Sequence, residues 1–142
     1  MADPALELQK SIRGVLVADS TLASLMGGAV KFFDYVPERE SLPYIEYREG
    51  STAEWDVDET GSATGFGREH TLTINVWSGY EGVKELRGIL RRVYDLLQNN
   101  TSLSLVDHNL VNLRFMFDDV VREPDGQSYH GISQFRAITE EI

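Results

Sequence analysis

The densest group of potential metal ligands lies in the acidic segment Asp56-Val57-Asp58-Glu59-Thr60-Gly61. Oxygen-bearing side chains at every second position, followed by glycine in sixth place, are the opening of an EF-hand calcium loop. Such a loop also needs a bidentate glutamate in twelfth place, where this sequence has Gly67. Because that ligand is missing and a strand follows instead of a helix, we interpret the segment as a solvated acidic loop.

Histidine is the other common metal ligand in the sequence, and its three copies stand far apart. His70, His108 and His130 include no pair at i, i+4, and cysteine is absent, so no zinc-binding spacing supports a site. His70 continues the alternation of Leu72 and Ile74, which predicts a partly buried side chain near one end of a sheet. We therefore expect no metal ion and no cofactor.

Nucleotide-binding and nucleophile motifs are incomplete. Gly65-Phe66-Gly67 resembles the start of a dinucleotide-binding fingerprint, but His70 stands where the third glycine belongs, and a strand follows rather than a helix. The chain has no Gly-x-Ser-x-Gly elbow and no cysteine nucleophile. The sequence thus predicts no catalytic residue and favours a protein that is not an enzyme.

Acidic pairs do not supply an active site either. Asp118-Asp119 and Glu140-Glu141 are neighbours in sequence, and neighbours on a strand point to opposite faces of the sheet. Two alternatives stay open. One is a small enzyme whose site is assembled from distant residues such as His70, Asp118 and His130, and the other is a monomeric protein-binding module.

Composition limits the classes of partner. Acidic residues outnumber basic ones 23 to 13, for a formal net charge of −10, whereas a protein that grips nucleic acid needs clustered lysine and arginine to displace counterions. No run of about 18 apolar residues occurs, so no membrane span is expected. A chain of 142 residues fits a single domain, 1–142, with one core.

One stretch of the chain carries a concentration of basic residues. Lys84, Arg87, Arg91 and Arg92 fall on the polar side of a predicted helix. One interpretation is a solvated face, supported by Arg91 and Asp95 at i, i+4. The other is a docking strip for an acidic partner surface, including the segment Glu49–Glu59 of a neighbouring copy.

Hydropathy periodicity predicts the elements that position these residues. Helices are expected from Pro4 to about Ala18, in a short turn carrying Leu22 to Met26, and from Val83 to Leu97, the last behind a Ser78/Glu81 capping box. Strands are expected at 30–36, 42–48, around Leu72, Ile74 and Val76, and at 103–106, 110–121 and 127–139.

Two expectations concern irregular parts of these strands. In 110–121, Val111, Leu113, Phe115 and Phe117 should share one face, and a phase slip between Ile132 and Phe135 predicts a bulge in the last strand. From Glu49 to Gly67 the pattern dissolves into a long acidic loop or hairpin extension, an adaptable contact segment. The fold class is α+β, an antiparallel sheet with two main helices packed on one face.

Several segments, taken in order, resemble the tail-completion, or tail terminator, family of long-tailed bacteriophages, prophages and gene transfer agents. The segments cover nearly the whole chain and read LASLMGGAVKFFDYVPE (22–38), LPYIEY (42–47), STAEWD (51–56), REHTLTINVWSGYEGVKE (68–85) and LVNLRFMFDDVVREPDGQSYHGISQFRA (110–137).

The resemblance implies a structural virion protein of the tail neck, assembled in the bacterial cytoplasm. Members form a homo-hexameric ring on the head-proximal end of the tail tube, stop the tail tube protein from polymerising and meet the connector or stopper protein of the head. DNA would pass through the ring without specific binding. The family has no catalytic residues to transfer.

A closed ring needs a heterologous interface, in which one patch meets a different patch of the next copy. An edge strand and the Gly50–Gly67 loop, with Trp55 and Phe66 as anchors, are candidates, and the basic strip would be the surface that they meet. The predicted interface residues are Trp55, Asp56, Asp58, Glu59, Phe66, Lys84, Arg87 and Arg91.

Overall fold

Helices and strands alternate in blocks along the chain. The computed structural model describes residues 1–55 and 67–142. Its helices are α1 (Pro4–Val17), α2 (Ser20–Leu25) and α3 (Lys84–Leu97), and its strands are β1 (Phe32–Phe33), β2 (Tyr44–Trp55), β3 (Gly67–Ser78), β4 (His108–Arg122) and β5 (Tyr129–Glu141).

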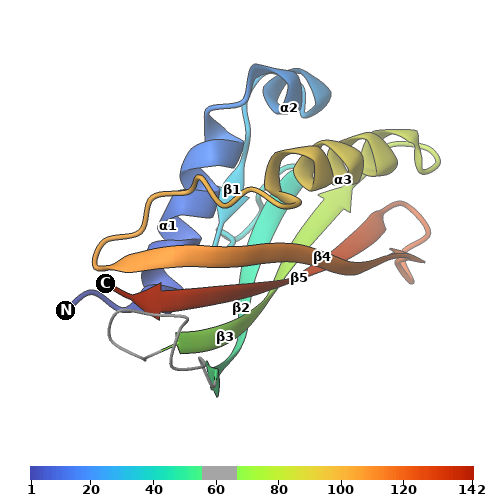
Figure 1. Ribbon diagram of the computed structural model, residues 1–142. Helices are drawn as coiled ribbons and strands as arrows, with labels where there is room; N and C mark the ends of the chain where they lie inside the picture. Colours follow the sequence, from blue (N-terminus) through green and yellow to red (C-terminus); the bar gives the residue numbers. More distant parts are fainter. Residues whose placement is uncertain (56–66) are drawn as a thin grey trace.

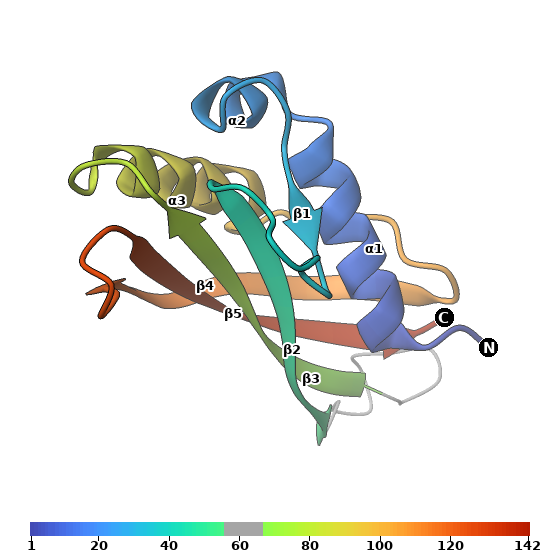
Figure 2. The ribbon, with the colours of Figure 1, turned by 180° about the vertical axis from the view of Figure 1, so that it is seen from behind.

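The strands form one sheet in the order β1-β2-β3-β5-β4. β2, β3, β5 and β4 are antiparallel neighbours, whereas β1 runs parallel to β2 through two residue pairs. The sheet is strongly twisted, and the main helices α1 and α3 cover the same face of it (Figures 1 and 2). This confirms the predicted α+β class, with a sheet that is mixed because of the short β1.

Helix α1 begins where its sequence provides a cap. Oδ1 of Asp3 accepts hydrogen bonds from the backbone N–H groups of Ala5 (2.9 Å) and Leu6 (3.1 Å). Pro4 occupies the first turn, where a missing N–H leaves no bond unmade. The apolar side chains that α1 buries in the core are Leu8, Ile12 and Leu16.

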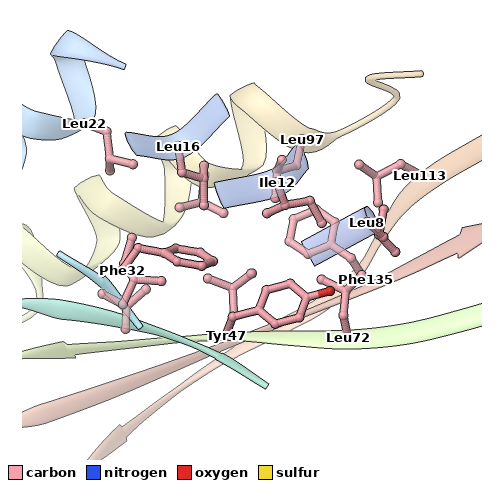
Figure 3. Packing of buried hydrophobic residues seen from close by; sticks show 14 of the residues in the cluster. Leu8, Ile12, Leu16, Leu22, Phe32, Tyr47, Leu72, Leu97, Leu113 and Phe135 are labelled. Atoms are coloured by element: carbon pink, nitrogen blue, oxygen red, sulfur yellow. The ribbon is translucent and has the colours of Figure 1, made fainter. Parts of the chain in front are cut away.

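The hydrophobic core fills the space between the helices and one face of the sheet (Figure 3). Leu72, Ile74 and Val76 of β3 alternate inward as predicted, and Phe135 of β5 is fully buried beside them. The apolar stripe of α3 covers these strands with Leu86, Ile89, Leu90, Val93 and Leu97.

The capping box predicted before α3 is wrong. Ser78 is still part of the sheet, paired with Tyr129, and its hydroxyl donates to Oε1 of Glu85 (2.7 Å) rather than serving as a helix cap. The helix begins only at Lys84, and its N-cap Val83 provides no side-chain hydrogen bond. Glu85 in the first turn instead interacts favourably with the helix dipole.

The predicted loop from Glu49 to Gly67 is, in its described part, one arm of a hairpin. β2 continues to Trp55 and pairs with β3 as far as Trp55 opposite Gly67. The sequence gives no sign of this continuation because every residue from Arg48 to Trp55 is exposed, so neither face of the strand needs apolar residues.

Two other predicted strands are much shorter than expected. The strand expected at 30–36 reduces to Phe32–Phe33, the two residues that pair with β2. The strand expected at 103–106 is an isolated bridge between Leu105 and His108.

The predicted bulge lies in β4 rather than in β5. Val111 and Met116 are the extra residues at the two register shifts between these strands. Leu113 and Phe115 therefore face the core, whereas Val111 and Phe117, predicted to share their face, are 50% and 47% exposed. β5 itself keeps its phase, with Gly131, Ser133, Phe135 and Ala137 buried in turn.

Gly131 allows a test of the packing between α3 and the sheet. A Cβ at this position would lie 2.9 Å from Cδ1 of both Leu86 and Leu90, so Gly131→Val must displace these two buried side chains or α3 itself. We expect the free energy of unfolding to fall by about 1–3 kcal/mol in urea titrations. Gly14→Ala, whose added Cβ meets nothing within 4 Å, is the control and should gain about 0.5–1 kcal/mol. Unchanged stability of Gly131→Val would contradict the packing.

Candidate functional site

Of the interface residues predicted between Trp55 and Phe66, the structure describes one. Asp56, Asp58, Glu59 and Phe66 lie outside the described residues, as does the run compared with a calcium loop. Trp55 is described and is the last residue of β2.

Trp55 lies on the sheet face that the helices leave open. The guanidinium carbon of Arg136 is 4.9 Å from the centre of its ring, and Arg136 donates to Oε2 of Glu69 (2.9 Å), which lowers the pKa of that carboxyl. A cation–π contact at an exposed site contributes about 0.5–1 kcal/mol. Trp55 is 37% exposed, so it is a surface side chain held in one position.

The predicted basic strip lies on the exposed side of α3. Arg91 Nε is 3.0 Å from Asp95 Oδ1, which confirms the predicted i, i+4 pair, and Arg87 Nη1 is 2.9 Å from Asp118 Oδ1. Lys84 is also exposed. Exposed pairs of this kind contribute less than about 1 kcal/mol, and a guanidinium has enough N–H groups to bind a second carboxylate.

A groove of about 360 Å³ separates this strip from β4. Its floor is apolar and aromatic, and its rim carries the two guanidinium groups, one of which lies 5.0 Å above the ring of Tyr94. The groove is lined by Arg87, Leu90, Arg91, Tyr94, Phe115 and Asp118.

Arg92 does not belong to the strip. Its Nη2 and Nε donate to the two carboxylate oxygens of Asp19 at 2.7 and 2.8 Å, and this pair lowers the pKa of Asp19. Asp19 also accepts from the N–H of Leu22 (2.8 Å) and so caps α2. Arg92 therefore joins α2 to α3 and has a structural role.

Two of the three histidines are buried among backbone and hydroxyl groups. His70 is 2% exposed and lies between the hydroxyls of Thr52 (3.1 Å from Nδ1) and Thr139 (2.9 Å from Nε2). Burial lowers its pKa. His108 is 4% exposed and its Nδ1 lies 2.9 Å from the carbonyl oxygen of Val106. Both have satisfied partners, which suits a structural role.

His130 stands on the open face of the sheet, next to the inward-facing Gly131. Its ring stacks on Trp77 with centroids 3.8 Å apart and an interplanar angle of 7°. Its Nε2 is 2.7 Å from Oδ1 of Asn75, and its Nδ1 is 3.5 Å from Oε1 of Glu123. Burial lowers the pKa of His130, while Glu123 acts in the opposite direction. The sequence alone does not indicate this stack, because Trp77 and His130 become neighbours only through the register of β3 against β5.

The distant residues considered for an enzyme site do not converge. His70 and His130 lie on opposite faces and about 23 Å apart along the sheet, since His130 pairs with Trp77, seven positions from His70. Asp118 is bound to Arg87. Among residues 1–55 and 67–142, no group of three or more histidine, aspartate or glutamate side chains could hold a metal ion, and no helix is long and apolar enough to cross a membrane.

The edge strand β4 exposes apolar side chains that the sequence assigned to the core or left unassigned. The outer edge of β4 is hydrogen-bonded to the two residues that follow α3. Asn99 N–H donates to the carbonyl of Leu113 (2.9 Å), and Phe115 N–H donates to Oε1 of Gln98 (2.6 Å). The remaining edge carries side chains that are 41–51% exposed, namely Val111, Met116, Phe117 and Val121.

Comparison with known families agrees with the resemblance of the sequence segments. The family described as Tail completion protein gp17 matches residues 10–140. The chain belongs to this family. The matched residues of this tail completion protein run from α1 to the end of β5 and include the strip, the groove and both ends of the sheet.

Solved structures extend the similarity to the whole fold. A chain in a structure of the virion of a native gene transfer agent particle superposes with a TM-score of 0.79 at 26% identity, over 99% of either chain. No curated protein matches. The chain is therefore a structural protein of a phage-type tail, located in the virion and not an enzyme.

We expect the tail completion protein to lose stability as the pH falls from 7 to 5. Burial lowers the pKa of His70 and His130 in the folded chain, whereas an unfolded histidine keeps a pKa of about 6.5. Below about pH 6.5 these histidines therefore bind protons in the unfolded chain but stay neutral in the folded chain. The free energy of unfolding should then fall by up to about 1.4 kcal/mol per pH unit for His70.

Urea titrations at pH 7, 6 and 5 measure this effect. Asp19, Glu69 and Asp125, whose pKa values are lowered, lose their contributions only below about pH 5, outside the range. His70→Gln keeps a polar side chain and cannot titrate, so its stability should depend less on pH. Equal stability at pH 7 and pH 5 in the wild type would contradict the assignment.

Proposed function

We propose that this protein forms a hexameric ring at the head-proximal end of a phage-like tail. There it ends growth of the tail tube and joins the tail to the connector or stopper protein of the head. The observation that carries the proposal is the match to a tail completion family along residues 10–140, together with the full-length likeness to a chain of a gene transfer agent virion.

The arrangement of the sheet suits a ring. A heterologous contact needs two different surfaces on each copy, and β4 and β2 lie near opposite ends of the sheet, separated by β5 and β3. The basic strip of α3 lies beside β4, where Arg87 pairs with Asp118. The exposed arm of β2 ends at Trp55, and in Figure 1 this end of β2 lies well away from α3. Each copy thus has two unlike surfaces.

The charge of the protein suits a passage for DNA. With a formal net charge of −10, the ring would repel the phosphate backbone at a distance instead of holding it. DNA is then cargo that crosses the lumen, and the binding partners are proteins: further copies of this chain, the tail tube protein and the head connector or stopper.

Deleting the gene tests the function in the producing cell. Particles without the protein should show overlong tails, or heads and tails that are not joined, in electron micrographs, because nothing would cap the tube or offer the head a surface. Expression of the wild-type chain in trans should restore joined particles. Normal tails joined to filled heads in the deletion strain would contradict the proposal.

Trp55→Ala tests whether the end of β2 takes part in ring formation. Because Trp55 is 37% exposed, the variant should stay folded, losing about 0.5–1 kcal/mol with the Arg136 contact. Mixed with tail tube protein, it should form fewer species of six subunits than the wild type in size-exclusion chromatography with light scattering.

Tyr35→Ala is the matched control, since Tyr35 is an aromatic side chain that is 84% exposed. It should assemble like the wild type. Unfolding of Trp55→Ala would show that Trp55 is a core residue, and unchanged assembly would remove it from the interface.

A further inference from the structure

We propose that neighbouring copies in the ring join their sheets edge to edge. Strand β4 of one copy would pair, antiparallel, with the Tyr47–Trp55 part of β2 in the next copy. The proposal rests on the ring proposed above and adds which surfaces meet and in which direction.

Both partners of this joint have a side without a neighbouring strand. β4 is the last strand of the sheet. Among the described residues, Leu113 and Phe115 are hydrogen-bonded to the residues just after α3, and His108 forms a bridge with Leu105, which leaves the second half of the outer edge without a neighbouring strand. At the other end, β1 pairs only with Ile45 and Glu46. Within the described residues, no strand therefore lies outside Tyr47–Trp55, and such edges present free N–H and C=O groups for pairing.

The side chains of β4 also favour a partner. A monomeric protein usually protects its edge strands with charges, proline, bulges or a short length. β4 has two bulges and the charges of Asp118 and Asp119, but it is 15 residues long and exposes apolar side chains. Phe117 and Val121, 47% and 41% exposed, pair with Gln134 and His130 and so lie on the open face of the sheet. A strand added beside β4 would cover part of this apolar surface.

The strand directions agree with a closed ring. β2, β3, β5 and β4 are successive antiparallel neighbours, so β2 and β4 of one copy run in opposite directions. Rotation about a ring axis along the strands preserves these directions. β4 would therefore meet β2 of the next copy antiparallel, in continuation of the existing pattern, and the contact would be heterologous as ring closure requires.

Charge identifies a second copy as the occupant. α3 and β4 together carry six basic and four acidic residues, in a chain with 13 and 23 overall, whereas β2 carries one basic and three acidic residues. Glu49 pairs with the buried Leu72, and Glu54 lies on the same, helix-covered side beyond the bulge. In a joined sheet both carboxylates would face Arg87 and Arg91 at the rim of the groove.

Disulfide scanning tests the joint directly, because the chain contains no cysteine. Ala53→Cys on β2 would be combined in turn with Phe117→Cys, Asp119→Cys and Val121→Cys on β4, three positions of one face that sample the register. Within one chain these strands are about 14 Å apart, three strand spacings. A disulfide requires Cα atoms within about 7 Å, so cross-links can form only between copies.

Oxidation of rings assembled with tail tube protein should give covalent multimers, up to the complete ring, for at least one combination. Single-cysteine variants, and Ala53→Cys combined with Gly14→Cys on α1, should give no such series. Rings that form without multimers in all three combinations would overturn the joint and leave the ring itself intact. Failure of the wild-type chain to form any ring would overturn both proposals.

A charge exchange provides a second test. The double variant Glu49→Lys/Glu54→Lys should raise the concentration needed for half-maximal ring formation at least about tenfold, because like charges would face each other in every interface. Arg87→Glu/Arg91→Glu should have the same effect, and the four substitutions together should restore assembly.

Net charge alone must be excluded as the reason for rescue. Lys10→Glu/Arg13→Glu, at two exposed positions of α1, restores the same net charge to Glu49→Lys/Glu54→Lys without changing the strip on α3, so it should not restore assembly. Circular dichroism checks that each variant is folded. Equal rescue by the α1 substitutions, or no effect of either double variant on assembly, would overturn the proposed pairing of β2 with the strip.

Discussion

The packing of α3 against the inward side of β3 and β5 is the contact on which the rest of the structure depends. The apolar stripe of α3 fits over Leu72, Ile74 and Phe135, and Gly131 lets the helix approach the sheet within van der Waals contact. Both main helices pack on this one side (Figure 2), so within residues 1–55 and 67–142 no helix covers the opposite face of the sheet.

Hydropathy periodicity predicted the helices and strands that bury one apolar face, and it failed for strand segments that bury neither face. α1, α3 and β3 follow from their apolar spacing. The second half of β2 has solvent on both sides, so its sequence carries no alternation. In β4, two bulges invert the faces, and a bulge depends on the partner strand, which the sequence of β4 alone does not reveal.

The interaction surface was predictable in part for similar reasons. The Arg91–Asp95 pair is local to one helix and follows from spacing. By contrast, the Arg92–Asp19 pair needs the position of α2, and the stack of His130 on Trp77 needs the register of β5 against β3. The groove beside Arg87 was predictable only in part. The wall formed by α3 follows from helical spacing, whereas the wall formed by β4 depends on the bulges of that strand.

The bulge at Met116 and the carboxylates of Asp118 and Asp119 have a consequence for the timing of assembly. Bulges and charges on an edge strand discourage chance pairing between free molecules. In the proposed ring, copies seated side by side on a tube would meet at a high local concentration that free copies in the cell never reach. Because free copies would pair only weakly through this edge, the protein would stay monomeric until copies bind side by side on a tail of full length.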